Sequence, residues 1–434
     1  MGDDDTDDDT GDDGTGGARR RLPDHHDEAA VRDELTRAFT VCSSCRRCVD
    51  LCAAFPRLLD RLDSPGVEDP GMLTPLEQDR IVDACHQCDR CTTRCPFAPG
   101  RHAESVDVAG LMTTAKAMQR VSGHRPMRDR LADRLLDPAG RVGAVAGRLL
   151  AGPAGVTAVD LPRRRRAASF SEWFGARSSP GTSGGRRVVL VPSCVVDHQH
   201  PALGADAVEV LEAAGAEVEL STAGCCGAYW LQVGDLDRYV SIAGEFVERL
   251  AEQVRASDAA VVVLHPTCAT AIVCRSPESV GQSVRADAEF VAGATRGVAA
   301  FVLEGEPPAA SKPLSGHIVF GASCHGTSTD EHDAVVELLR RAGGEVTVVD
   351  GCPGVGGSWG VRHDRSAIAA DLGARWDRQV TGELAAESVE VGYCPDAIDG
   401  VARRTGRRPE QAVSLIARLV RDGWSIAPGP AGAD

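Results

Sequence analysis

Two cysteine runs with identical spacing constrain this chain more than any other feature. Residues 42–52 read CSSCRRCVDLC and residues 85–96 read CHQCDRCTTRCP, so each run contains Cys-x2-Cys-x2-Cys-x3-Cys. The 434-residue chain has sixteen cysteines in all. Its acidic N-terminus, MGDDDTDDDTGDDGTGG, has no apolar segment, so we expect no secretory signal and a cytoplasmic protein with reduced thiols. So many cysteines then indicate metal binding or redox chemistry rather than disulfides.

The spacing of the two runs predicts a pair of iron–sulfur clusters. A [4Fe–4S] cluster needs four thiolates around a compact cube, and in two-cluster ferredoxins the fourth cysteine of each run binds the other cluster. We therefore expect one cluster on Cys42, Cys45, Cys48 and Cys95, and a second on Cys85, Cys88, Cys91 and Cys52. Structural zinc is the alternative, but zinc usually takes two separated Cys-x2-Cys pairs, which fits two runs of four poorly.

The hydrophobic pattern changes along the chain and predicts an α+β multidomain protein. An α-helical two-cluster ferredoxin domain is expected first, followed by a duplicated α/β cysteine-rich domain. In the helical part, TPLEQDRIVDAC begins with a capping box and a proline at the first helical position. The expected boundaries are an acidic disordered tail at 1–27, the helical domain at 28–125, a linker at 126–185, and cysteine-rich repeats at 186–300 and 314–425.

The two α/β halves carry cysteines at matching points, which indicates an internal repeat. In the first half, Cys194 follows a strand, Cys225 and Cys226 lie before Gly227 after the second strand, and Cys268 follows the third. The second half keeps the same order with Cys324, Cys352 and Cys394. Because the carboxyl ends of parallel strands share one edge of a sheet, we expect each set of cysteines to converge.

These motifs resemble a known family. The two cysteine runs, with CPFAPGRHAESVDVAGLMTTAKA, resemble α-helical two-cluster ferredoxin modules of heterodisulfide reductases, of the C subunit of anaerobic glycerol-3-phosphate dehydrogenase and of the iron–sulfur subunit of glycolate oxidase. The α/β halves are similar to the cysteine-rich CCG domain of the same proteins. That domain has a Cys, a Cys-Cys-Gly and a Cys-x2-Cys, which can hold a non-cubane cluster at a disulfide-reducing site. The resemblance implies an iron–sulfur component of an electron-transporting oxidoreductase.

The first repeat departs from the family pattern at its last cysteine pair. Position 271 is alanine, and Cys274 can replace the missing cysteine only if the backbone turns back. The resemblance still implies a third cluster on Cys194, Cys225, Cys226 and Cys268. The adjacent Cys225 and Cys226 have two other interpretations, a redox-active thiol pair and small buried apolar residues.

The second repeat departs further. Pro353 stands where the second cysteine of Cys-Cys-Gly belongs, and Ala397 stands at the position of the final cysteine. The remaining candidate ligands are Cys324, His325, Cys352 and Cys394. Such a set can hold a cluster with one open iron site, a zinc ion, or nothing.

Composition excludes several functions. The net charge is −16 and no basic stripe is present, which argues against nucleic-acid binding. No run of about eighteen apolar residues occurs, so a transmembrane helix is not expected and membrane association would come only through a partner. No dinucleotide or flavin motif is visible. A redox partner, either a flavoprotein dehydrogenase or a rubrerythrin-like protein, must therefore exchange electrons with the chain.

Two hypotheses follow from these observations. The first is an electron-transfer subunit that relays electrons through two [4Fe–4S] clusters to or from the cysteine-rich domain. The second is a catalytic disulfide or thiol reductase of the heterodisulfide reductase type, with Cys225 and Cys226 as the catalytic residues.

Overall fold

Helices and two small parallel sheets make up the structure, a computed structural model, as the sequence predicted for an α+β chain. The acidic tail as far as residue 21 and most of the expected linker lie outside the described residues. The domain boundaries stay predictions. The structure describes residues 22–135, 137, 168–178, 185–305, 314, 316–322, 324–326, 329–357, 359, 360 and 362–424.

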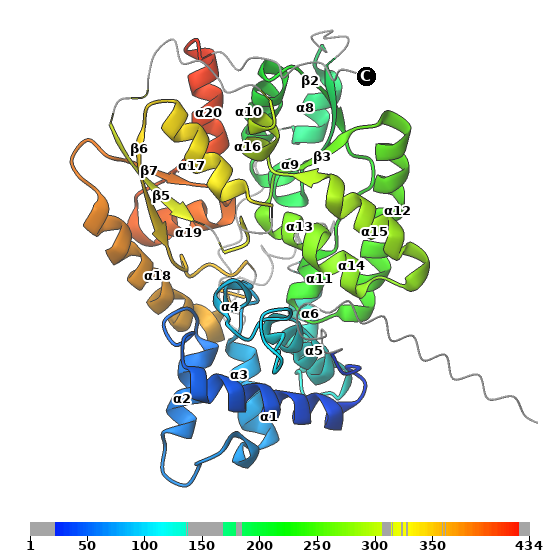
Figure 1. Cartoon of the computed structure of the whole chain (residues 1–434), viewed down its shortest axis with the longest axis vertical. Helices are drawn as coiled ribbons and strands as arrows, with labels where there is room; N and C mark the ends of the chain where they lie inside the picture. The colour runs from blue at the N-terminus through cyan, green and yellow to red at the C-terminus, as the bar shows by residue number, and fades with distance from the viewer. Residues whose placement is uncertain are drawn as a thin grey trace, which may run out of the picture.

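Six helices form the lower part of the molecule in Figure 1. Their bounds are Glu28–Cys45 (α1), Ala54–Leu62 (α2), Pro75–Ala84 (α3), Arg90–Arg94 (α4), Val108–Val121 (α5) and Met127–Leu135 (α6), with a 3-10 turn at Pro70–Met72. The capping box predicted for α3 is confirmed, because Thr74 and Glu77 cap each other's backbone N–H groups. Helix α5 is buried from Val108 to Gln119 and contacts α1, α3 and α4. It is therefore the central helix of this group.

The first sheet has four parallel strands in the order β2-β1-β3-β4. The strands are Arg186–Val191 (β1), Ala216–Leu220 (β2), Ala260–Val263 (β3) and Thr295–Arg296 (β4). The helices around it are Phe170–Ala176 (α8), Cys194–Gln199 (α9), Pro201–Ala213 (α10), Ala228–Gln232 (α11), Leu236–Ser257 (α12), Pro266–Thr270 (α13), Ser276–Ser279 (α14), Gln282–Ala294 (α15) and Val298–Leu303 (α16). A π-helical turn, Ala271–Arg275, joins α13 to α14. Central strands β1 and β3 are buried on both faces, which explains their continuous apolar sequence.

The second sheet repeats this topology in the order β6-β5-β7-β8. Its strands are His317–Ala322 (β5), Glu345–Asp350 (β6), Val389–Gly392 (β7) and Glu410–Gln411 (β8), all parallel. Its helices are Glu331–Arg341 (α17), His363–Glu383 (α18), Pro395–Thr405 (α19) and Ala412–Arg421 (α20). The equivalent positions of the two sets of strands agree with the internal repeat predicted from the cysteine order.

The two α/β units share one hydrophobic core. Buried side chains from β1 and α16, such as Leu190 and Phe301, belong to the same cluster as Phe320 of β5 and Leu415 of α20. Helix α10 also contacts α20, and α16 contacts α17 (Figure 1). Burial of this apolar surface holds the units together, so the edges that carry their cysteines face each other at a fixed position.

Two helices fall inside the range that we predicted as a linker. Helix α8 buries Phe170 in the shared core. Helix α6 contributes Asp133, which is 2% exposed and pairs with Arg120 at 3.0 Å and Arg125 at 2.8 Å. Within the described residues, the beginning and the end of the expected linker are therefore parts of the folded structure.

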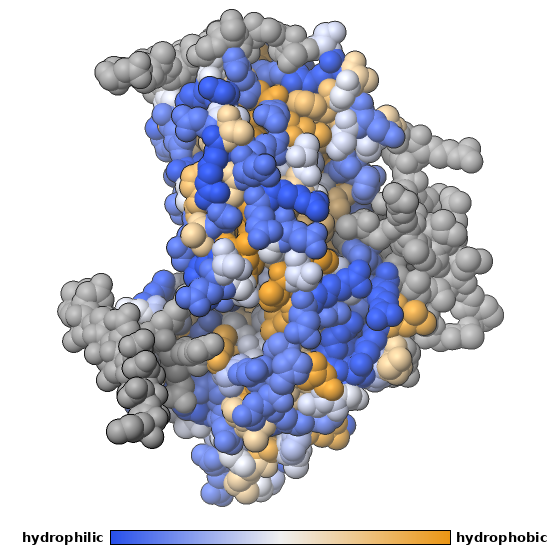
Figure 2. Space-filling view, turned by 90° about the vertical axis from the view of Figure 1, so that its right-hand side faces the viewer, coloured by the Kyte–Doolittle hydropathy of each residue, from blue (hydrophilic) through white to orange (hydrophobic). Residues whose placement is uncertain are grey.

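None of the helices that the structure describes is both long and apolar enough to span a membrane. Figure 2 shows one face of the molecule, which is mostly hydrophilic, with apolar residues in small separate patches. Single exposed apolar side chains of this kind are normal on protein surfaces.

Candidate functional site

The first candidate site gathers Cys42, Cys45, Cys48 and Cys95 around one small pocket of the helical region, which Cys91 also lines. Burial raises the pKa of Cys42, and the neighbouring thiols of Cys48, Cys95 and Cys45 raise it further. Burial, followed by Cys95 and Cys45, raises the pKa of Cys48 to about 11. Such mutual repulsion occurs only between thiolates that are close to one another. The cysteine that ends the second run thus lies with the first three cysteines of the first run.

The second candidate site gathers Cys52, Cys85, Cys88 and Cys91 around an adjacent pocket, which Cys48 also lines. Burial raises the pKa of Cys52, and Cys88 and Cys85 raise it further. Burial also raises the pKa of Cys91, with added contributions from Cys88, Cys85 and Cys52. The fourth cysteine of the first run therefore lies with the first three of the second run. The assignment of each cysteine to one cluster stays a prediction.

Left-handed backbone inside the two runs brings the thiols together. Arg46 has φ of 53°, Gln87 of 54° and Asp89 of 57°. Residues other than glycine rarely adopt these angles, and they cluster at functional sites. The turn at Gln87 also lets its backbone N–H donate to the Sγ of Cys85 at 3.4 Å. A hydrogen bond to a ligand sulfur is one of the factors that set the potential of an iron–sulfur cluster.

A buried lysine lies beside the second group of cysteines. Lys116 of α5 is 4% exposed, and its Nζ donates to the backbone oxygen of Cys85 at 2.5 Å. Burial lowers the pKa of Lys116 to about 8, although Cys85 and Asp83 oppose this shift. A positive charge at this position favours additional negative charge on the neighbouring sulfurs. No sequence pattern had singled out this lysine.

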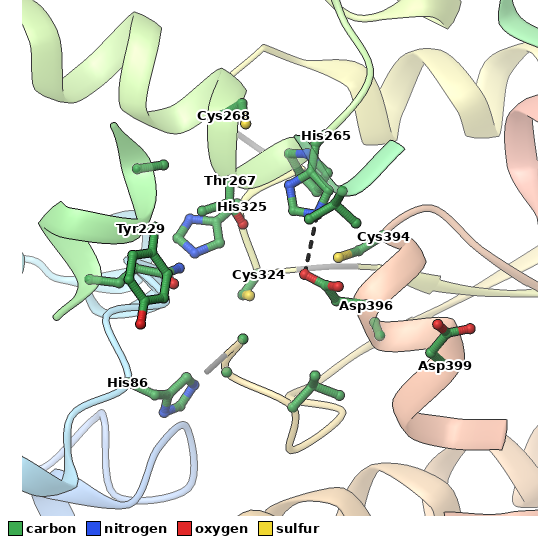
Figure 3. Close-up of a pocket in the computed structure, with 18 of the residues that line it drawn as sticks. His86, Tyr229, His265, Thr267, Cys268, Cys324, His325, Cys394, Asp396 and Asp399 are labelled. Carbon is green, nitrogen blue, oxygen red and sulfur yellow. Dashed lines mark hydrogen bonds and ion pairs between the residues drawn. The ribbon is translucent and has the colours of Figure 1, made fainter. Parts of the chain in front are cut away.

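The third candidate site is a cavity of about 180 Å³ between the two α/β units (Figure 3). Seven cysteines line it, and the second unit contributes His325 as well. The cysteines are Cys194, Cys225, Cys226, Cys268, Cys324, Cys352 and Cys394. Cys274 does not line the cavity, because it belongs to the π-helical turn that follows α13. The structure therefore brings together every predicted cysteine of the two repeats except Cys274.

The four cysteines of the first unit form a continuous group in the cavity wall. Thiols of Cys194 and Cys226 donate to Cys225, which lowers the pKa of Cys225. A hydrogen bond from Cys226, together with His265, lowers the pKa of Cys268 despite burial. The Gly227 N–H also donates to the Sγ of Cys225 at 3.4 Å. Cys225 is thus the thiol of this group with the strongest tendency to ionise.

Gly227 is required for this geometry. Its φ is 77°, and it begins helix α11 directly after the cysteine pair. A β-carbon at this position would lie 3.0 Å from the buried ring of Tyr239. The glycine of the Cys-Cys-Gly sequence therefore permits both the left-handed turn and the close approach of α12.

The second unit connects the cavity to the second cysteine group of the helical region. His86, between Cys85 and Cys88, has its Nε2 3.4 Å from the Sγ of Cys352. Burial raises the pKa of Cys324, and Cys88 is the first of the neighbouring thiols that raise it further. His86 also lines the cavity. The second candidate site and the cavity are therefore direct neighbours.

His265 and Asp396 link the two units across the cavity wall. The Nε2 of His265 and the Oδ2 of Asp396 are 3.2 Å apart, and His265 is 3% exposed (Figure 3). Burial would lower the pKa of His265, but hydrogen bonds with Asp396, Cys268 and Cys394 outweigh this effect and raise it well above its usual value. Sequence reasoning missed both residues. Their only signal was position, since His265 follows β3 in HPTC and Asp396 follows β7 in CPDA.

Ion pairs fix the helical region against both α/β units. Arg275 of the π-helical turn pairs with Asp89 at 2.7 Å. Asp350, at the end of β6, pairs with Arg90 at 2.6 Å and also with Arg94. Both contacts involve the loop and helix of the second cysteine run, so they hold that run against the mouth of the cavity.

Comparison with known proteins identifies the class first. A family model described as "Cysteine-rich domain" (CCG) matches residues 188–273, which include all four cysteines of the first unit. The chain is related to the iron–sulfur subunits of dehydrogenases, and the resemblance inferred from the cysteine motifs is confirmed.

Individual relatives match parts of the chain. It is 27% identical over 255 residues to the C subunit of anaerobic glycerol-3-phosphate dehydrogenase from Escherichia coli K12, covering 58% of this chain and 64% of that protein. It is 27% identical over 208 residues to the glycolate oxidase iron-sulfur subunit of the same strain, covering 46% and 48%. Citrate utilization protein B of Escherichia coli is 32% identical over 83 residues, 19% of each chain. The chain thus spans less than two thirds of the length of each of these relatives.

Proposed function

We propose that this chain is an iron–sulfur electron-transfer subunit with two [4Fe–4S] clusters and a third redox centre in the cavity. The first cluster would be held by Cys42, Cys45, Cys48 and Cys95, and the second by Cys52, Cys85, Cys88 and Cys91. The third centre would be held by Cys194, Cys225, Cys226 and Cys268. The observation that carries the proposal is the gathering of the eight ferredoxin-type cysteines around two adjacent pockets, one of which adjoins the cavity.

The residues of all three sites fit such groups. Each site places half-buried or buried cysteines close to one another, and no disulfide joins any of the sixteen cysteines. In the first two sites the close thiols have raised pKa values, so their thiolates are costly unless cations neutralise them, and iron does so. A bound [4Fe–4S] cluster takes up and releases single electrons. The protein would supply the ligands, the N–H donors at Gln87 and Gly227, and the charge of Lys116.

The order of the three sites suggests a route for electrons through the molecule. The pocket of the first group adjoins the exposed turn at Arg46 and Arg47. The second group lies between it and the cavity, with His86 and Cys88 on the cavity side. We propose that a redox partner, a flavoprotein dehydrogenase or a rubrerythrin-like protein, docks near the first group. The partner would exchange electrons with the chain there, because no flavin or nicotinamide motif is visible in the sequence.

A second candidate function is a disulfide or thiol reductase at Cys225 and Cys226. The lowered pKa of Cys225, caused by hydrogen bonds from Cys194 and Cys226, favours this candidate, since the thiolate is the reactive form. Reduction of a small disulfide by the pre-reduced chain, without a partner, would support it. That reaction should disappear in Cys225→Ser if this thiol is the nucleophile.

The Cys225→Ser variant tests the third centre. Serine keeps the size of the side chain but is a poor ligand for iron, so the variant should lose about four irons per chain and the matching EPR signal. The signals of the other two clusters should persist, because their ligands lie in a separate region. Cys274→Ser is the matched control and should keep the iron content of the parent chain. Full iron content in Cys225→Ser would contradict the assignment.

A further inference from the structure

The cavity wall holds a set of side chains that the proposed clusters do not use. His265 follows β3 of the first unit, while Cys394 and Asp396 follow β7 of the second. One ligand atom from each of these three residues lies within 4.8 Å of the other two. They combine the nitrogen, sulfur and carboxylate donors that zinc accepts in proteins. All three also line the cavity (Figure 3).

The distance between His265 and Asp396 matches the shell of a tetrahedral ion. Two ligand atoms bound to zinc at about 2.0–2.1 Å lie roughly 3.3 Å apart at the tetrahedral angle. The Nε2 of His265 and the Oδ2 of Asp396 are 3.2 Å apart. A thiolate at about 2.3 Å from the same ion would lie roughly 3.6 Å from each of them, which is inside the observed limit of 4.8 Å.

We propose that His265, Cys394 and Asp396 form a zinc site that joins the two α/β units, with its fourth position open to the cavity. Three protein ligands and one open position are typical of catalytic rather than structural zinc. The cavity of about 180 Å³ leaves room at that position for a water molecule or a small thiol or carboxylate. Zinc has no redox chemistry, so its role would be to bind and polarise a ligand next to the cysteines of the first unit.

A zinc site explains why a thiol lies beside the His265–Asp396 pair, which a simple ion pair does not. A nearby pair has the same geometry without a thiol: the Nε2 of His200 lies 3.3 Å from the Oδ2 of Asp399. It also joins the two units, and Asp399 occupies the next turn of α19 after Asp396. Among the described residues, no cysteine joins His200 and Asp399 as a third ligand. Asp399 also accepts a hydrogen bond from Arg408 at 2.8 Å. The His200 pair therefore provides a matched control for the zinc site.

The test measures zinc and iron in the same anaerobically purified full-length chain, produced in medium with added Zn²⁺. The parent chain and His200→Gln should hold about one zinc per chain, with X-ray absorption showing one sulfur and about three nitrogen or oxygen ligands. His265→Gln and Asp396→Asn should lose at least about nine tenths of that zinc while their iron and sulfide contents stay at the parent level. His265→Cys should keep zinc and gain a second sulfur ligand at about 2.3 Å.

Three results would overturn the zinc site: a parent chain without zinc, zinc at the parent level in His265→Gln, or a shell composed only of sulfur. An all-sulfur shell would mean that zinc occupies one of the cysteine groups instead. The iron and sulfide contents decide the cluster proposal separately, so failure of the zinc site and failure of the proposed function give different results.

Discussion

Replacing Cys95 with serine should remove about four irons per chain, and adding Cys45→Ser to the same chain should remove no more. Both cysteines lie in the first group, so either substitution already destroys the same proposed cluster. By contrast, Cys91→Ser combined with Cys95→Ser should remove about eight irons. These two cysteines follow each other in the second run but belong to different groups. Iron and sulfide analysis with EPR of the reduced proteins measures the effect.

The two double variants show whether the fourth cysteine of each run binds the cluster of the other run or the cluster of its own run. If each run held its own cluster, Cys91→Ser with Cys95→Ser would remove about four irons and Cys45→Ser with Cys95→Ser about eight. That reversed outcome would contradict the grouping seen in the structure. Because the comparison uses double variants with a shared substitution, a general loss of stability would affect both and would not produce the difference.

Asp89→Asn should lower the free energy of unfolding by about 2–3 kcal/mol. The substitution removes the nearest partner of the buried Arg275, whose charge is then balanced by Asp107 and by Glu278, which is 3.7 Å away. Asparagine tolerates left-handed backbone, so the φ of 57° at this position should add little cost. Anaerobic urea denaturation, followed by circular dichroism, gives the change.

An exposed ion pair provides the control for this effect. Arg46 and Asp63 are 2.8 Å apart, but their side chains are 50% and 55% exposed. Asp63→Asn should therefore lower the free energy of unfolding much less than Asp89→Asn does, because solvent screens an exposed pair. Adding Arg275→Met to Asp89→Asn should recover part of the loss, since it removes the unpaired charge. Equal effects of the two aspartate substitutions would mean that the Asp89 pair does not hold the regions together.

Sequence spacing predicted the parts of the site that depend on short-range geometry. The exchange of Cys52 and Cys95 between the two ligand sets is a prediction from the two runs, and the structure places each of them beside cysteines of the other run. The apolar strands and the cysteines at their ends predicted that each unit would direct its cysteines to one edge. These inferences need only local patterns and the general behaviour of parallel sheets.

Contacts between distant segments could not be predicted in this way. His86 and Cys352 are 266 positions apart, and His265 and Asp396 are 131 apart. The first contact depends on how the helical region packs against the second unit, and the second contact on how the shared core orients the two α/β units; no local pattern encodes either. The π-helical turn that removes Cys274 from the cavity is also set by packing, since Tyr239 and Ser276 both donate to the carbonyl of Ala271. The left-handed turns at Gln87 and Asp89 could not be predicted either, because neither residue is a glycine.

The number of clusters is the central claim, and the iron and sulfide content of the anaerobically purified chain tests it most directly. Three clusters predict about twelve irons and a matching amount of sulfide per chain, with three EPR signals after reduction. About eight irons would leave the cavity cysteines without a cluster and remove the third centre. A chain that held zinc in all the cysteine groups, or no iron after anaerobic purification, would contradict the electron-transfer account as a whole.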